Sequence, residues 1–463
     1  MSSFYISAAH KSSGKTTLSI GISAAIRQRG LSIQSFKKGP DYIDPIWLSQ
    51  ATGRPCYNLD FFTSGRDFIL NQYNQYRQQK DVVLVEGNMG LFDGMALDGS
   101  DSNAAMARLL NIPVILVVDT SGTSRGIAPL LNGYQSFDKD IQYAGVILNK
   151  VAGSRHQSKL TNVIREYTDF NILGSVPRNS DIQVTERHLG LIPGYEMEEA
   201  SNTVIDLLAT RVRENIDIDA LLSIKTEIPA STQKQSFSGS INKDKSERLK
   251  IAVAMDKAFG FYYPGDLQQF EQQVVEIVPF NCIKDSKLPP QIDGLFIGGG
   301  FPETQLEKLS LNKSMLGSIK EAIEGGLPTY AECGGLMYLC DQISYENKTF
   351  PMCNVIEANV EMHKRPQGRG YVVLESTDSH PWLSNEKQTI KAHEFHYSAL
   401  NGLPKNTNFA YTIKRGAGID SINDGIILHN MIASYSHLRQ TDECSWVDNF
   451  VSFVKRCNGQ SKK

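Results

Sequence analysis

Short apolar runs and amphipathic segments alternate along the first half of the chain. Residues 4–8 form a mostly apolar run of strand length, whereas 16–29 carries its apolar residues at helical spacing. A second helical segment is expected at 127–137. Further strands are expected at 31–36, 81–86, 113–119, 143–151 and 172–176. Strands that alternate with helices are typical of a doubly wound parallel sheet, so an α/β domain is predicted here.

The pattern stops after residue 216 and later resumes. Residues 225–248 are rich in Ser, Thr, Gln and Lys with few large apolar side chains, a composition that is typical of a linker. New strand patterns follow at 250–255, 274–279 and 292–297. Because 463 residues are too many for one ordinary core, the chain is expected to form two α/β domains. Their predicted ranges are 1–220 and 249–457, with a linker at 221–248.

Composition and charge narrow the class of protein. A formal charge of -3, with acids and bases well mixed, gives no large basic field, so neither nucleic acid nor a membrane is expected as a partner. The seven cysteines are scattered without a C-x-x-C pair, which argues against a disulfide framework and a zinc cluster. No apolar stretch reaches about 18 residues and no basic signal region precedes the first strand. We therefore expect a cytoplasmic protein, either a monomer or a homodimer.

The turn between the first strand and the first helix resembles the end of a phosphate-binding loop. Gly14, Lys15 and Thr16 match the G-K-[ST] tail of that motif, whose backbone N–H groups and lysine hold phosphates and whose hydroxyl ligates Mg²⁺. Thr17 continues the same first helical turn. Ala9 stands where the motif has its first glycine. The strand–turn–helix context favours a nucleotide site over an incidental helix start.

Polar residues follow several predicted strands, at the edge where open α/β sheets bind ligands. Lys37 and Asp41 lie in a Gly-Pro turn after the second strand, and this turn fits either a phosphate and metal site or a solvated loop. Glu86 ends a buried β-branched strand, which is the Walker B arrangement for holding Mg²⁺. Asn149 ends a later strand, where it either reads a nucleotide base or is simply a polar strand end.

A second candidate site is centred on Cys333. Residues 328–331 are predicted as a strand and 336–339 as the first apolar turn of a helix, so the thiol stands at a tight strand-to-helix turn. The positive end of a helix dipole lowers the pKa of a thiol. Cys333 is therefore a candidate nucleophile, and its alternative is a buried core cysteine.

Glycines near this cysteine fit an oxyanion hole. Gly299 and Gly300 follow the strand at 292–297, and Gly334 follows the cysteine, so their backbone N–H groups are candidate donors to a developing negative oxygen. A plain tight loop has the same appearance. A thiol nucleophile also needs a base. Spacing alone does not choose between five of the nine histidines, His363, His393, His396, His429 and His437.

Together, these motifs resemble those of one family, the cobyrinic acid a,c-diamide synthases, which are amidotransferases of corrinoid synthesis. The segments that resemble its ATP-binding half, itself similar to dethiobiotin synthetase, are 36–45, 51–55, 58–60, 86–94 and 148–151. The segments that resemble its class I glutaminase half are 258–264, 298–303, 331–339, 393–398 and 433–437. The resemblance thus covers nearly the whole chain.

The resemblance implies an activity and roles for individual residues. The substrates would be ATP, L-glutamine and a corrinoid polycarboxylate, with Mg²⁺ as a cofactor. Cys333 matches the glutaminase nucleophile and His437 the histidine that activates it. The residues expected around the nucleotide are Gly14, Lys15, Thr16, Thr17, Lys37 and Asn149, and those around the metal are Thr16, Asp41 and Glu86.

Departures from the family pattern leave some assignments open. Lys11-Ser12 stands where the family usually has Ser-Gly, and Arg439 stands where a second histidine usually follows His437. The third member of the triad is not identified. Alternative substrates would make the chain a nickel-sirohydrochlorin or hydrogenobyrinic acid a,c-diamide synthase, or a cobyric acid synthase. A partition-type nucleotide switch is an alternative of another class, but Cys333 and the second domain have no place in it.

Overall fold

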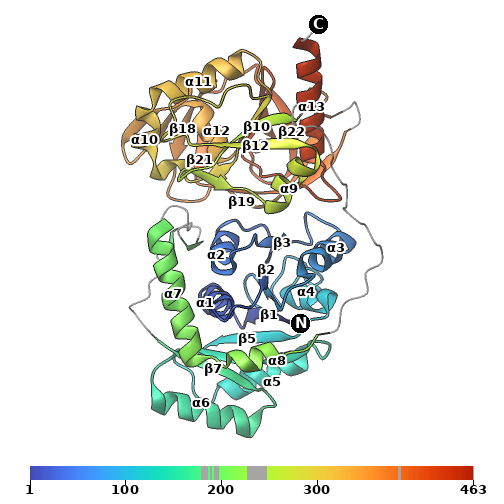
Figure 1. The fold of residues 1–463 in the computed structure, drawn as a ribbon, viewed down its shortest axis with the longest axis vertical. Coiled ribbons are helices and arrows are strands. Elements are labelled where there is room, and N and C mark those ends of the chain that lie inside the picture. The colour runs from blue at the N-terminus through green and yellow to red at the C-terminus, as the bar shows by residue number, and fades with distance from the viewer. Residues whose placement is uncertain (179–185, 188–189, 192–197, 227–247, 384–386, 462–463) are drawn as a thin grey trace. The chain divides into compact units, whose positions relative to one another are not determined.

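The computed structural model describes residues 1–178, 186–187, 190–191, 198–226, 248–383 and 387–461. The chain divides into two compact units, Met1–Ser236 and Phe237–Lys463 (Figure 1). Most of the predicted linker, 221–248, lies outside the described residues. Its first residues belong to the helix α8 (Ile218–Ser223).

The first unit is built on a parallel sheet of seven strands in the order β3-β2-β4-β1-β5-β6-β7. These strands are β1 (Ser2–Ala8), β2 (Ile33–Lys38), β3 (Tyr57–Leu59), β4 (Val82–Glu86), β5 (Val114–Asp119), β6 (Tyr143–Val151) and β7 (Ile172–Pro177). The predicted doubly wound sheet is confirmed. The pattern missed β3, which has only three residues at the edge of the sheet.

Helices cover this sheet. They are α1 (Lys15–Gln28), α2 (Ile43–Thr52), α3 (Arg66–Arg77), α4 (Asn103–Leu110), α5 (Ile127–Phe137), α6 (Ser154–Tyr167) and α7 (Glu198–Asn215). Apolar side chains of α3 to α6 share one core with the strands. α1 packs closely on α7 at Gly21. A Cβ added at this position would lie only 2.7 Å from the Leu208 carbonyl oxygen. A short hairpin, β8 (Glu186–Arg187) with β9 (Gly190–Leu191), precedes α7.

Parallel pairing brings the predicted phosphate-site residues to one edge of the sheet. Glu86, the last residue of β4, is paired with Ile6 of β1 on one side and with Lys37 of β2 on the other. The loop between β1 and α1 therefore begins beside the ends of β2 and β4. This is the carboxyl edge at which open parallel sheets bind ligands.

The second unit contains a mixed sheet of nine strands in the order β12-β10-β13-β15-β24-β23-β22-β19-β20. The parallel strands are β10 (Leu249–Ala254), β12 (Val275–Phe280), β13 (Gly294–Ile297), β15 (Thr329–Glu332) and β24 (Met431–Ser434). The antiparallel strands are β19 (Gly368–Ser376), β20 (Thr389–His396), β22 (Asn408–Arg415) and β23 (Asn423–Leu428). The sequence pattern identified β10, β12, β13 and β15 and missed the antiparallel strands.

Smaller elements complete the second unit. A four-stranded sheet contains β16 (Cys340–Tyr345), β17 (Lys348–Pro351), β18 (Ile356–Met362) and β21 (Ser398–Asn401), and β11 (Phe259–Phe261) pairs with β14 (Gly299–Gly300). The helices are α9 (Pro264–Gln272), α10 (Leu306–Leu311), α11 (Lys313–Glu324), α12 (Gly334–Leu339) and α13 (Trp446–Ser461), with a 3₁₀ turn at Pro302–Thr304. In the part of the chain that is described, no helix combines the length and apolarity needed to span a bilayer.

Candidate functional site

The predicted phosphate loop connects β1 to α1 through two residues with left-handed backbone conformations. Ser12 has φ 63° and Gly14 has φ 92°. A Cβ at Gly14 would lie 2.2 Å from Asn149 Nδ2, so only glycine fits here without displacing Asn149. The Thr17 hydroxyl donates to the Gly14 carbonyl at 2.9 Å, and this bond holds the first turn of the helix.

Two side chains at the end of β6 donate hydrogen bonds to this loop. Asn149 Nδ2 donates to the Ser13 carbonyl at 2.8 Å, and Lys150 Nζ donates to the Ser12 carbonyl at 3.0 Å. Lys150 is itself held by Asp119, whose Oδ2 is 2.7 Å away. Asn149 therefore positions the phosphate loop through its amide nitrogen. Its predicted contact with a nucleotide base remains a prediction.

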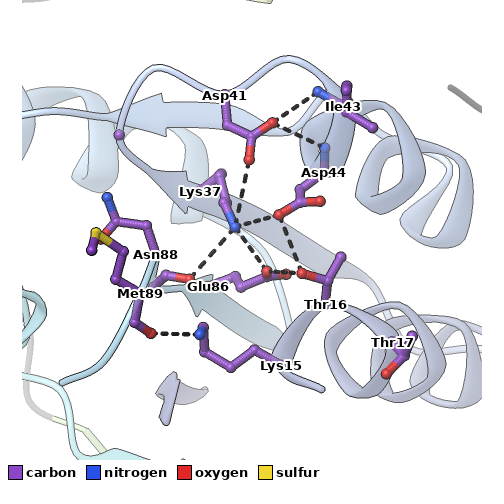
Figure 2. Close-up of polar contacts among 12 residues, drawn as sticks. Lys15, Thr16, Thr17, Lys37, Asp41, Ile43, Asp44, Glu86, Asn88 and Met89 are labelled. Carbon is purple, nitrogen blue, oxygen red and sulfur yellow. Dashed lines mark hydrogen bonds and ion pairs between the residues drawn. The ribbon is translucent and has the colours of Figure 1, made fainter. Parts of the chain in front are cut away.

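Lys15, the first residue of α1, points back across the loop. Its Nζ donates to the Met89 carbonyl at 2.5 Å, in the loop that follows β4 (Figure 2). Burial, together with the charge of nearby Lys37, lowers the pKa of Lys15 to about 8. An anion bound here would stabilise the Lys15 ammonium, because the ammonium is partly desolvated and donates to a neutral carbonyl.

Lys37 lies at the centre of a cluster of carboxylates (Figure 2). Its Nζ is 2.5 Å from Asp44 Oδ2, 2.8 Å from Glu86 Oε1 and 3.7 Å from Asp41 Oδ2. Burial opposes the charge of Lys37, but the carboxylates outweigh it and raise the pKa of Lys37 well above its usual value. Burial also raises the pKa of Glu86. The opposite charges therefore stabilise one another around Lys37 and Glu86, whose side chains are buried, while Asp41 and Asp44 lie nearer to solvent.

Asp44 is a member of this cluster that lies in the predicted charged turn but was not predicted as a metal ligand. The Thr16 hydroxyl is 2.7 Å from Glu86 Oε1 and 3.2 Å from Asp44 Oδ2, so Asp44 and Glu86 flank the predicted metal-binding hydroxyl. Asp41 instead accepts the backbone N–H groups of Ile43 and Asp44 at 2.9 and 3.2 Å, at the start of α2. An acid one helical turn after Asp41 was the available signal.

The donor set suits a hard divalent cation. Carboxylate and hydroxyl oxygens are the ligands that Mg²⁺ prefers. Glu86 Oε2 is buried and has no hydrogen-bond partner among the described residues, so it is an unsatisfied acceptor in this site. No group of three or more His, Cys, Asp or Glu in the described ranges is arranged as a metal site, and the cation that these carboxylates contact is the ammonium of Lys37. Thr16, Asp44 and Glu86 nevertheless fit Mg²⁺ by their chemistry.

Cys333 occupies the strained turn that its sequence predicts. It lies between β15 and α12 with φ 45° and ψ −99°, a conformation that side chains rarely adopt. Its N–H donates to the Ser434 carbonyl at 2.7 Å, and its carbonyl accepts from Met337 N–H at 3.0 Å. These two bonds hold the turn, so the sulfur is fixed at the carboxyl edge of the central parallel strands.

The prediction that the helix dipole lowers the pKa of Cys333 is wrong, because the pKa is raised. Burial raises the pKa of this thiol above its ordinary range, and the negative charge of Glu303 adds to the effect. The backbone N–H of Gly334 opposes it but does not prevail. The physical reason is that α12 has only six residues, so the field at its N-terminus is outweighed by desolvation. The thiol thus needs a cation or a base to become a nucleophile.

The predicted oxyanion-hole glycines converge beside Cys333. A Cβ at Gly334 would lie 3.2 Å from the Gly300 backbone nitrogen, and one at Gly299 would lie 2.5 Å from His437 Cε1. Gly299, Gly300, Gly334 and His437 therefore share one small region. Side chains at the glycine positions would fill it. Their role as donors stays a prediction.

Of the candidate histidines, His437 and His396 have clearly different surroundings. His437 Nδ1 is 3.3 Å from Glu332 Oε2, and its ring stacks on His393 with centroids 4.9 Å apart. His396 Nδ1 is 2.8 Å from the Ser398 carbonyl, its Nε2 is 3.8 Å from Glu394 Oε2, and its ring stacks on Tyr435 with centroids 3.8 Å apart. Both histidines thus lie near a buried carboxylate, but at His437 the carboxylate faces Nδ1, whereas at His396 it faces Nε2. His437 thus has its Cε1 close to Gly299 and its Nδ1 facing the Glu332 carboxylate.

Glu332 is the second residue that sequence reasoning missed. It is buried at the end of β15, directly before Cys333. An acid that ends a buried strand is the same signal that singled out Glu86 in the first unit. In the second unit the acid directly precedes Cys333, and the sequence analysis selected the cysteine and not the acid.

Comparison with known proteins gives matches for both units. Residues 6–192 match the CobQ/CobB/MinD/ParA nucleotide binding domain, and residues 250–443 match the CobB/CobQ-like glutamine amidotransferase domain. A cobyrinate a,c-diamide synthase of Magnetococcus marinus is 41% identical over 458 residues, which cover 97% of this chain and 96% of the relative. Proteins of the same name are 37% identical in Caldanaerobacter subterraneus subsp. tengcongensis, with 99% of each chain covered, and in Methanosarcina barkeri, with 94% and 92% covered.

Proposed function

This chain belongs to the cobyrinate a,c-diamide synthase family, and we propose that it amidates the a and c side-chain carboxylates of cobyrinic acid with ATP and L-glutamine. The chain is an amidotransferase of the ligase class, with a nucleotide-binding domain and a glutamine amidotransferase domain. The observation that carries the proposal is similarity over nearly the full length of relatives that bear this name.

In the first unit, a carboxylate oxygen of the substrate attacks the γ-phosphorus of ATP, which yields an acyl phosphate and ADP. Such a transfer depends on positioning and on neutralising the phosphoryl oxygens. Lys15 turns from the Met89 carbonyl to the phosphate, and Lys37 supplies a second positive charge at the same sheet edge. Bound Mg²⁺ would supply further charge neutralisation, held by Thr16, Asp44 and Glu86. Ammonia then attacks the acyl carbon and phosphate leaves.

In the second unit, Cys333 releases that ammonia from glutamine. His437 takes the proton from the thiol, and the thiolate attacks the carboxamide carbon to give a tetrahedral oxyanion. Backbone N–H groups at Gly299, Gly300 and Gly334 are the proposed donors to this oxyanion. His437 returns the proton to the leaving nitrogen, so ammonia departs and a thioester remains. Water then hydrolyses the thioester to glutamate.

The test is to offer cobyrinic acid, ATP, Mg²⁺ and glutamine to the purified chain and to identify the product by mass spectrometry. The a,c-diamide is expected. The Cys333→Ala variant should lose the reaction with glutamine and keep it with free ammonia, because the thiol serves only to release nitrogen. Amidation of a nickel-sirohydrochlorin or of hydrogenobyrinic acid in preference to cobyrinic acid would overturn the substrate. Equal loss with both nitrogen donors in a folded variant would overturn the two-site mechanism.

A further inference from the structure

Glu332 and His437 come together because the two strands that bear them are neighbours. Glu332 is the last residue of β15, and β15 pairs in parallel with β24, which places Glu332 opposite Ser434. The chain that continues from β24 returns His437 to the same strand end, where its Nδ1 is 3.3 Å from Glu332 Oε2. The side chains of both residues are only 3% exposed, so this contact is shielded from water.

The carboxylate is held in place without the help of the histidine. Its other oxygen, Oε1, accepts the Leu438 backbone N–H at 2.9 Å and the Tyr330 hydroxyl at 2.8 Å. Two donors on one oxygen fix the plane of the carboxylate. Oε2 is therefore directed at His437 by bonds that do not depend on the imidazole.

We propose that Glu332 is the positioning residue of the glutaminase site, acting on Cys333 through His437 and filling the third place of the triad. This inference rests on the proposed roles of Cys333 and His437. An acceptor at Nδ1 keeps the proton of the neutral imidazole on that nitrogen, which leaves the lone pair on Nε2. The carboxylate also stabilises the imidazolium that forms when His437 takes the thiol proton.

Two charged neighbours of His437, Asp424 and Arg439, make contacts with other residues. Asp424 accepts the backbone N–H groups of Tyr435 and Ser436 at 3.0 and 2.9 Å. Arg439, which stands at the family's second histidine, lies with its guanidinium 5.4 Å from the centre of the Tyr263 ring. His437 forms an ion pair with Glu332.

The decisive variant is Glu332→Gln. Glutamine keeps an oxygen for the Leu438 N–H and the Tyr330 hydroxyl, but presents an amide in place of the negative oxygen at His437. The matched control is Tyr330→Phe, which removes one bond to Oε1 and leaves the Oε2 contact with His437 intact. We expect Glu332→Gln to lower kcat for glutamine hydrolysis by about 10²–10⁴-fold with little change in KM, and Tyr330→Phe to lower it by less than about tenfold.

The pH profile of Cys333 alkylation separates positioning from a direct effect of charge. Glu332 and Asp424 each raise the pKa of the thiol through their charge, as Glu303 does more strongly. The His393 ring stacks on the His437 imidazole, and the charges of His437 and Arg439 both act on His393. If Glu332 acted only by its charge on the sulfur, Glu332→Gln would move the profile to lower pH. If it supports the imidazolium that pairs with the thiolate, the profile moves to higher pH, which is the expected result.

Each outcome decides a separate point. A shift to lower pH, an unchanged profile, or an equal loss of kcat in Tyr330→Phe would overturn the inference. Nitrogen NMR of the wild type with labelled histidine, assigned with His437→Gln, gives a check that needs no Glu332 variant. A neutral His437 that carries its proton on Nε2 would also overturn the inference. If the wild type does not amidate cobyrinic acid while hydrolysis and alkylation depend on Glu332, the proposed substrate fails and this inference stands.

Discussion

Lys37 Nζ and Asp44 Oδ2 form an ion pair 2.5 Å long, and the same carboxylate oxygen accepts the Thr16 hydroxyl at 3.2 Å. Asp44 thus links Lys37, the second-last residue of β2, to Thr16 in the first turn of α1, and Glu86 Oε1 is bonded to both Lys37 and Thr16. Lys37 neutralises the acids that fit a metal ion, so metal binding and the position of this lysine are coupled.

Asp44→Asn is expected to weaken the apparent affinity for Mg²⁺ more than Asp41→Asn does. Asp44 lies beside Thr16 and Glu86, whereas Asp41 Oδ1 is engaged by two backbone N–H groups at the start of α2. Loss of one anionic ligand should raise the Mg²⁺ concentration for half-maximal ADP formation by about tenfold or more. Titration of Mg²⁺ at saturating ATP measures this, with calorimetry of nucleotide binding in parallel. A larger shift for Asp41→Asn would restore Asp41 as the main ligand.

Lys15→Ala is expected to abolish synthesis with either nitrogen source, because ammonia does not react with an unactivated carboxylate. A loss of about 10³-fold in the rate of acyl phosphate formation is expected, since phosphoryl transfer depends on neutralising charge. Lys11→Ala is the matched control, because Lys11 is an exposed lysine of the same loop. Retained ATP-dependent amidation in Lys15→Ala, with loss in Lys11→Ala, would mean that the phosphate contact belongs to Lys11.

Gly299→Ala is expected to damage the glutaminase site alone. The new Cβ would lie 2.5 Å from His437 Cε1, a separation that forces the imidazole to move. Glutamine-dependent synthesis should fall by about 10²-fold, and ammonia-dependent synthesis should remain. Gly317→Ala in α11 is the control, since its Cβ would meet nothing within 4 Å. Full activity of Gly299→Ala with glutamine would contradict the position of His437.

His380 is expected to make the second unit less stable in acid. Burial lowers the pKa of this imidazole to about 4, and its nitrogens contact the Tyr411 hydroxyl and the Trp382 N–H. The unfolded chain takes up a proton below about pH 6.5 while the folded chain stays neutral. The unfolded state therefore binds more protons, and stability falls as the pH drops from about 6.5 to about 4, by at most about 3 kcal/mol from this residue.

The measurement is urea unfolding at pH 7 and at pH 4.5 in the wild type and in His380→Asn. Asparagine keeps an oxygen that can accept the Trp382 N–H, but it takes up no proton in this range. The variant should lose less stability than the wild type between the two pH values. Parallel losses would show that His380 contributes nothing to the acid sensitivity.

The sequence pattern predicted those parts of the fold that local periodicity determines. Buried parallel strands such as β4 are continuous apolar runs, and their ends can be read directly. The antiparallel strands were missed because they are only partly buried, as in β19, where the buried Val372, Leu374 and Ser376 alternate with the half-buried Val373 and Glu375. Their pairing depends on distant segments, and no short motif marks it.

The candidate sites follow the same division. Lys15, Thr16, Glu86 and Cys333 belong to motifs whose chemistry is local. Asp44 and Glu332 act through partners that only the tertiary structure brings near. Each has a local signal, an acid one helical turn after Asp41 and an acid that ends a buried strand, but that signal does not identify the partner. The pKa of Cys333 was wrong because burial of the sulfur is a property of the whole packed unit, and a dipole argument from six residues leaves it out.

The position of β24 also determines when the second unit is finished during synthesis. β24 lies between β15 and β23, and the contact between Glu332 and His437 joins residues 105 positions apart. A ribosome makes β16 to β23 before the strand that closes the sheet. Until β24 emerges, β15 has an open parallel edge and Glu332 lacks the partner that shares its buried site. A nascent chain stalled before residue 431 should therefore bind chaperones and resist folding, and glutaminase activity should be among the last properties that the growing chain acquires.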